Sequence, residues 1–207
     1  MANLMEMLQS QLSEGVLNQL TQTIGANNKE QTQAAASGIL STLTAALAKN
    51  AATPEGASAL ASALDRDHDG SILDDVMGML GGASNNNTPT QSSALNGAGI
   101  LKHVLGGKQS NVIDMISKMS GLNSGQSGSL MEMLAPMVLG TLGKQKKQAN
   151  LDQSGLSDIL SKSVKSDASN NAQMSLITRF LDQDGDGSVM DDIAGMGMSM
   201  LGKFFKK

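Results

Sequence analysis

Residues 16–26, VLNQLTQTIGA, carry apolar side chains at helical spacing, and Gly25 is suited to a helix C-cap. Residues 112–122, VIDMISKMSGL, repeat the pattern at an offset of 96 (112 − 16). A second pair agrees, because residues 39–50, ILSTLTAALAKN, match residues 134–145, LAPMVLGTLGKQ, at an offset of 95 (134 − 39). Two matches at nearly one offset indicate an internal duplication. We therefore expect an all-α fold of two related multihelical repeats.

The composition supports a helical core without aromatic packing. The chain has 207 residues, enough for one large domain or for two of about 100 residues each. It contains 15 Met and three Phe but no Trp or Tyr, so Leu, Ile, Val, Met and Ala must fill the core, and strands are not expected. Cysteine is absent, which excludes disulfides, cysteine zinc sites and thiol catalysis.

A polar stretch suggests where the two repeats join. Residues 81–93, GGASNNNTPTQSS, have the composition of a linker. We assign residues 1–82 to the first repeat, 83–96 to the linker and 97–207 to the second repeat. The two Asp-rich loops described below lie 117 residues apart (182 − 65), so the second repeat has gained about 20 residues, around KQKKQANLDQSGLSDILSKS.

Several local signals mark helix ends. Asn28 can cap a long helix, with Gln31 at the reciprocal position of a capping box. Thr53-Pro54-Glu55 opens the next helix, whose apolar face consists of Ala57, Leu60, Ala61 and Leu64. Residues 97–110, GAGILKHVLGGKQS, read as a helix with a glycine cap and not as a phosphate-binding loop. Pro136 is expected to kink or split the helix that contains it.

Two Asp-rich stretches indicate cation sites. Residues 64–76, LDRDHDGSILDDV, and residues 181–193, LDQDGDGSVMDDI, each contain D-x-D-x-D-G, the beginning of an EF-hand calcium loop. Carboxylate oxygens suit a hard cation, and the glycine allows the sharp turn at the sixth position. Mg²⁺ and Mn²⁺ remain alternatives, although a carboxylate-rich ligand set favours Ca²⁺. The candidate ligands are Asp65, Asp67, Asp69, Ser71, Asp74, Asp75, Asp182, Asp184, Asp186, Ser188, Asp191 and Asp192.

The loops depart from the EF-hand pattern at their ends. Val76 and Ile193 occupy the twelfth position, where a bidentate Glu is expected. The closing carboxylate must therefore come from Asp74 or Asp75 in the first loop, and from the matching pair in the second. This gives two shortened helix-loop-helix elements, with loops at 65–75 and 182–192, and about two Ca²⁺ ions per chain.

The last residues form a separate amphipathic stretch. Met196, Met200 and Phe204 recur at four-residue spacing, and lysines follow them. A helix docked on its own domain is the first interpretation, and a helix that contacts a partner or a membrane surface is the second. The chain begins without a basic signal segment and has no membrane-spanning apolar run, so we expect a cytoplasmic protein.

The chain resembles the bacterial family catalogued as domain of unknown function 937, which is related to YidB-like proteins. The resemblance rests on GILKHVLGG, on SGL followed by LMEMLAPMVLGTLGKQ, and on the LDxDxDGSxxDD loops. It implies a compact multihelical fold and supplies no catalytic residues.

These features favour a non-enzymatic calcium-binding protein in which the metal is structural or regulatory. The two histidines, His68 and His103, have no recognisable catalytic partner. The lysines are scattered and stacking aromatics are lacking, so nucleic acid is not an expected partner. The alternative is a structural protein or scaffold that assembles with itself, as a homo-oligomer or filament stabilised by calcium.

Overall fold

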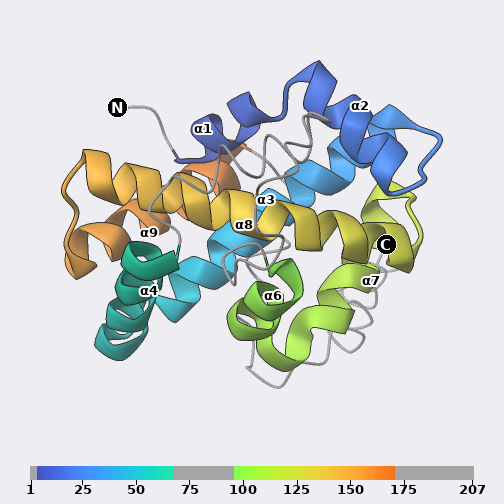
Figure 1. Ribbon diagram of the computed structural model, residues 1–207. Coiled ribbons are helices and arrows are strands. Elements are labelled where there is room, and N and C mark those ends of the chain that lie inside the picture. Colours follow the sequence, from blue (N-terminus) through green and yellow to red (C-terminus); the bar gives the residue numbers. More distant parts are fainter. Residues whose placement is uncertain (1–3, 68–95, 171–207) are drawn as a thin grey trace, which may run out of the picture.

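The computed structural model describes residues 4–67 and 96–170, except for the side chains of 67 and 168–170. Every regular element in these two ranges is helical, which confirms the expected all-α class for this part of the chain (Figure 1). The predicted linker lies outside these ranges apart from Asn96. The elements are α1 (Leu4–Gln11), α2 (Glu14–Thr23), α3 (Lys29–Asn50), α4 (Pro54–Asp67), α6 (Gly97–Leu105), the 3-10 turn η2 (Gly106–Lys108), α7 (Gln109–Ser120), α8 (Ser124–Gln148) and α9 (Gln153–Asn170).

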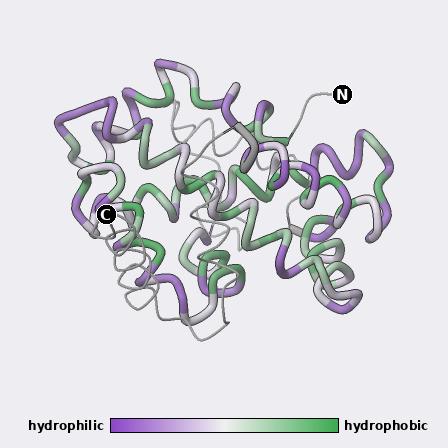
Figure 2. Tube along the Cα trace, turned by 180° about the vertical axis from the view of Figure 1, so that it is seen from behind, coloured by the Kyte–Doolittle hydropathy of each residue, from purple (hydrophilic) through white to green (hydrophobic). Residues whose placement is uncertain are grey.

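The two longest described helices, α3 and α8, form the centre of the fold. They cross each other, and the other helices surround them (Figure 1). Residues 41–47 of α3 and 134–143 of α8 are buried without interruption, so neither helix presents a polar face along these stretches. A helix that is buried all round lies in the interior of its domain. The hydropathy view agrees, since apolar residues line the inner segments and polar residues the outer loops (Figure 2).

Both predicted repeats contribute to one hydrophobic core. Its fully buried members include Leu20 and Ile39 from the first repeat, and Leu101, Leu134 and Leu160 from the second. Helix α3 packs against α6, α7, α8 and α9, all of which follow it after the predicted linker. Truncating such a buried leucine to alanine typically costs about 2–5 kcal/mol. The described helices therefore depend on each other across the boundary between the repeats.

An asparagine cap begins each of the two central helices. The side chain of Asn28 accepts a hydrogen bond from the Gln31 amide (3.1 Å), which confirms the predicted cap, whereas the reciprocal bond of a capping box is seen at Asn123. Asn123 accepts one from the Gln126 amide (2.9 Å), and the Gln126 side chain accepts one from the Asn123 amide, which completes a capping box. These asparagines are 95 residues apart (123 − 28), the offset found in the sequence.

Equivalent glycines also end the preceding helices. Gly25 follows α2 and Gly121 follows α7, with φ angles of 64° and 80°. This left-handed conformation is open to glycine at little cost and strained for most other residues. The glycines are 96 residues apart (121 − 25), again the sequence offset.

Of the two outcomes expected at Pro136, a kink or a split, the split does not occur, because α8 runs unbroken from Ser124 to Gln148. Proline has no N–H to donate to the carbonyl four residues earlier, which is that of Glu132. The first residue of α6, Gly97, packs against this carbonyl, and a Cβ atom on Gly97 would lie only 1.9 Å from the Glu132 oxygen. The backbone of α6 thus covers the part of α8 where the helical hydrogen bond is missing.

A buried polar contact ties α9 to α3. The Ser41 hydroxyl donates a hydrogen bond to the Asp167 carboxylate (2.6 Å), and Asp167 is only 8% exposed. Buried polar groups of this kind are costly unless they are hydrogen-bonded. The pair therefore fixes the register between two helices that are 126 residues apart in the sequence at this point.

Candidate functional site

Helix α4 leads into the first predicted calcium loop. It begins as the sequence predicts, because the Thr53 hydroxyl accepts a hydrogen bond from the Gly56 amide (3.1 Å) and Pro54 occupies the first helical position. The helix continues to Asp67, so its last turn contains Asp65, the first candidate ligand. Because α4 reaches Asp67, the first three positions of the predicted loop, 65–67, lie within this helix.

The buried face of α4 fixes the position of this last turn. Ala57, Ala61 and Leu64 are buried, and Leu60 is partly buried against the core, in agreement with the predicted apolar face. The helix packs against α3, α8 and α9, and the Gln153 side chain of α9 donates a hydrogen bond to the Ser58 hydroxyl (3.3 Å). Asp65 follows directly after the buried Leu64 and thus lies at the edge of the packed body.

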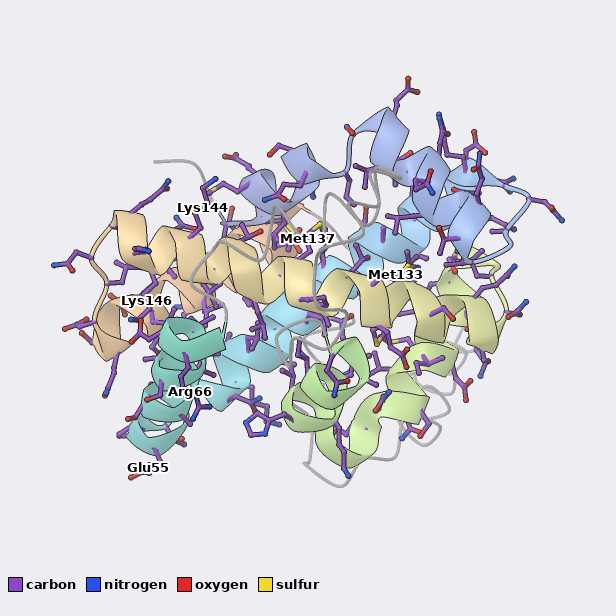
Figure 3. The ribbon with its side chains drawn as sticks, in the orientation of Figure 1. Glu55, Arg66, Met133, Met137, Lys144 and Lys146 are labelled. Carbon is purple, nitrogen blue, oxygen red and sulfur yellow. The ribbon has the colours of Figure 1, made fainter. Side chains whose placement is uncertain are left out.

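Asp65 already has a cationic partner. The Lys146 ammonium, in the last turn of α8, donates a hydrogen bond to the Asp65 carboxylate. The Lys146 side chain is 14% exposed and the Asp65 side chain 67%, so the lysine is held by its surroundings while the carboxylate faces solvent. Figure 3 shows Lys146 on the side of α8 that faces α4. Any cation that uses Asp65 as a ligand has to compete with this ammonium group.

The carboxylate of Asp152 lies beside the same depression as Asp65 and Lys146. A surface depression of about 570 Å³ is lined by Asp65, Lys146 and Asp152, among others. Hydrogen bonds from the Gly155 amide and the Ser154 hydroxyl (both 2.8 Å) hold the pKa of Asp152 below its ordinary value. Asp152 is thereby the N-cap of α9, and its carboxylate accepts hydrogen bonds from the first turn of that helix.

The donor chemistry of Asp65 fits a hard cation, since its carboxylate oxygens are exposed at the point where the predicted loop starts. The Asp67 side chain and Asp69, Ser71, Asp74 and Asp75 lie outside the described residues, as do all six ligands of the second loop, its entering helix and the C-terminal stretch. Within the described ranges, no three acidic, histidine or cysteine side chains come together as metal ligands. The two histidines also differ: His68 is outside the described ranges, and His103 is exposed on α6.

Sequence reasoning missed Lys146 and Asp152. Lysines near the C-terminal end of a helix are ordinarily explained by the helix dipole. Nothing in residues 144–148, KQKKQ, therefore distinguishes Lys146 as the partner of a residue 81 positions away. Asp152 was open to prediction, because Asp followed by Gln-Ser-Gly has the spacing of an N-cap bonded to an amide three residues on.

The described helices include none with both the length and the apolar character needed to cross a bilayer. A search of curated proteins and a search of solved structures each gave no match. A family model described as "Bacterial protein of unknown function (DUF937)" matches residues 6–145. The match includes the first Asp-rich loop and ends before the second. It covers 140 of the 207 residues (145 − 6 + 1), so this chain belongs to the DUF937 family of bacterial proteins.

Proposed function

We propose that this protein is a non-enzymatic calcium-binding helical protein. The observation that carries the proposal is the position of Asp65, which starts a D-x-D-x-D-G loop in the last turn of a well-anchored helix and presents an exposed carboxylate there. The same motif recurs at residues 182–187. An entering helix followed by alternating carboxylates and a glycine is the arrangement that calcium loops of EF-hand type use.

The metal has a structural role in this proposal, because the five aspartates of each loop repel one another without a cation. Calcium binds the folded loop in preference to the unfolded chain, so it stabilises the fold by mass action. At a free calcium concentration 100 times the Kd, this linkage amounts to about 2.7 kcal/mol for one site.

The proposal includes two related repeats, each ending in a short-loop helix-loop-helix element. The equivalent asparagine caps of α3 and α8, and the equivalent glycines after α2 and α7, support the repeats. The second loop, 182–192, then follows α9 along the chain, within the second repeat. The closing ligand of each loop is one of the two trailing aspartates.

Calorimetry on the metal-free protein tests the proposal. We expect about two Ca²⁺ per chain for the natural sequence, and loss of both binding events when Asp65→Asn and Asp182→Asn are combined. Asp158→Asn is the matched control, since Asp158 is exposed on α9 and its ion pair with Lys162 is long at 4.0 Å. Absence of calcium heat in the natural protein would refute the proposal, and so would unchanged binding in the double variant.

The same titration, followed by light scattering, tests the alternative of calcium-dependent self-assembly. Calcium binding as proposed here takes place within one chain, so particle size stays constant while the sites fill. A rise in particle size with calcium would instead favour a structural or scaffold protein that assembles with itself.

A further inference from the structure

The start of α6 contains the chain's single Asn-Gly dipeptide, Asn96-Gly97. An asparagine side-chain amide is open to attack by the backbone nitrogen of the next residue, and glycine hinders this attack least because it has no side chain. Asn96 is exposed, so its amide is accessible to water, whereas Gly97 is buried. The dipeptide lies outside the calcium loops and has no part in the proposed function.

The fold holds Asn96 in a conformation that does not allow this attack. The reaction closes a five-membered ring, in which the Cβ atom of Asn96 and the nitrogen of Gly97 must eclipse each other about the Asn96 Cα–C bond. For an L residue, the eclipsed arrangement corresponds to a ψ angle of about −120°. Asn96 has a ψ angle of 79°, so its Cβ atom and the Gly97 nitrogen lie on nearly opposite sides of that bond. Ring closure therefore requires a rotation of almost half a turn.

Two hydrogen bonds oppose this rotation. The side-chain oxygen of Asn96, Oδ1, accepts one from the Gly99 amide (2.9 Å), and its backbone carbonyl accepts one from the Ile100 amide (3.0 Å). Gly97 is fixed as well, because it packs so closely on the Glu132 carbonyl that a Cβ atom would have no room. Since α6 holds its side of the bond in place, the Asn96 side chain must leave its capping position before the ring can form.

We propose that Asn96 is a site of spontaneous deamidation and that the cap of α6 controls its rate. Once the cap is open, the Gly97 nitrogen attacks Cγ of Asn96 and the N–Cγ bond forms. The Cγ–Nδ2 bond breaks, and ammonia leaves with the proton of the Gly97 amide, which gives a cyclic imide. Water then opens the ring. Cleavage between the nitrogen and Cγ gives an aspartate, and cleavage between the nitrogen and the backbone carbonyl carbon gives an isoaspartate.

The two products have different effects on α6. Aspartate caps a helix about as well as asparagine does, and its negative charge is favourable at the start of a helix. Isoaspartate instead places Cβ and Cγ within the main chain, which lengthens the chain directly before Gly97. Because Gly97 has no room to move closer to Glu132, the longer chain has to displace the start of α6 or the residues before it. Deamidation thus preserves the cap in one product and removes it in the other.

Peptide mapping by mass spectrometry, after incubation in a mildly alkaline buffer, measures the deamidated fraction at each asparagine. Asn123 is the internal reference, because its side chain caps α8 with the same kind of hydrogen bond but is followed by Ser124. In concentrated urea we expect Asn96 to deamidate faster than Asn123. In the folded protein Asn96 should react at least about fivefold more slowly than in urea, the factor that corresponds to one helix cap. Equal rates at Asn96 in the two conditions would overturn the proposal, as would no deamidation of Asn96 in urea.

Two glycine variants test whether the cap is the barrier. Gly99→Ala places a Cβ atom 2.9 Å from Nδ2 of Asn96 and displaces that side chain, so the folded variant should deamidate about fivefold faster than the folded natural protein. Gly107→Ala, just after α6, is the control and should leave the rate unchanged, because a Cβ atom there meets nothing within 4 Å. Circular dichroism verifies that each variant is folded. An unchanged rate in folded Gly99→Ala would contradict the proposal, and if this variant does not fold, the comparison of the natural protein in buffer and in urea still decides.

Discussion

The crossing of α3 and α8 and the exposed end of α4 are held together by different forces. At the crossing, uninterrupted buried stretches pack closely, and the α6 backbone at Gly97 lies against the α8 backbone at Glu132. At the end of α4, an ion pair with Lys146 joins Asp65 to α8. Exposed ion pairs contribute little to stability, whereas close packing tolerates almost no change. The crossing therefore determines the fold, while the end of α4 can change its partner without disturbing the core.

The largest expected loss of stability is at Gly97, where α6 meets α8. Gly97→Ala places a Cβ atom 1.9 Å from the Glu132 carbonyl oxygen, so α6 has to move away from α8. We expect a loss of about 3 kcal/mol in the free energy of unfolding, measured by urea denaturation. Gly107→Ala is the control, because a Cβ atom there meets nothing within 4 Å. Equal stability of the two variants would mean that the close approach of α6 to α8 is not a constraint.

A smaller effect is expected at the start of α8. Asn123→Ala removes the side chain that accepts the Gln126 amide, and it should cost about 1 kcal/mol in a thermal or urea unfolding experiment. Asn28→Ala at the start of α3 should cost a similar amount, because each asparagine side chain accepts one amide hydrogen bond. A tenfold difference between the two unfolding equilibrium constants would show that the two helix starts are not equivalent.

At the end of α4, substitution of Lys146 should affect cation binding more than stability. Lys146→Gln is expected to change the free energy of unfolding by less than about 1 kcal/mol. It should raise calcium affinity about fivefold, since it removes a competing positive charge next to Asp65. Lys144→Gln is the control on the same helix, and Figure 3 shows Lys144 and Lys146 on different sides of α8. A calorimetric titration that gives the same affinity for both variants would argue against competition at Asp65.

The smallest expected effect is on the acid dependence of stability, and it arises at Asp152. The pKa of Asp152 is lower in the folded protein than its ordinary value of 3.8, because amide and hydroxyl groups hydrogen-bond its charged form. Its contribution to stability is complete above pH 3.8 and is lost as the pH falls through the lower folded value. Asp152→Asn should therefore flatten the acid dependence of unfolding below this pH. A variant with the same acid dependence as the natural protein would mean that this cap is not linked to pH.

The local elements could largely be predicted from the sequence, because their signals lie within a few residues. Asn28, Thr53-Pro54 and the glycine after α6 form the helix ends that their neighbours predict. The continuity of α8 through Pro136 could not be predicted, since the packing of α6 against α8 has no signal at the proline itself.

The contacts between distant helices could not be predicted in this way. Lys146 and Asp65 are 81 residues apart, and Ser41 and Asp167 are 126 apart. Neither pair has a spacing that distinguishes it from other lysines, serines or aspartates. The aspartates of the loop were recognisable from their spacing, whereas the ammonium group beside the first of them became visible only once α4 and α8 were placed.

The most direct test of the central claim is the calcium stoichiometry of a single-loop variant. Asp182→Asn removes the first carboxylate of the second loop and leaves the first loop, at the end of α4, intact. Calorimetric titration should give about two calcium ions per chain for the natural protein and about one for this variant. A stoichiometry that is the same for both proteins would contradict the account of two separate calcium loops.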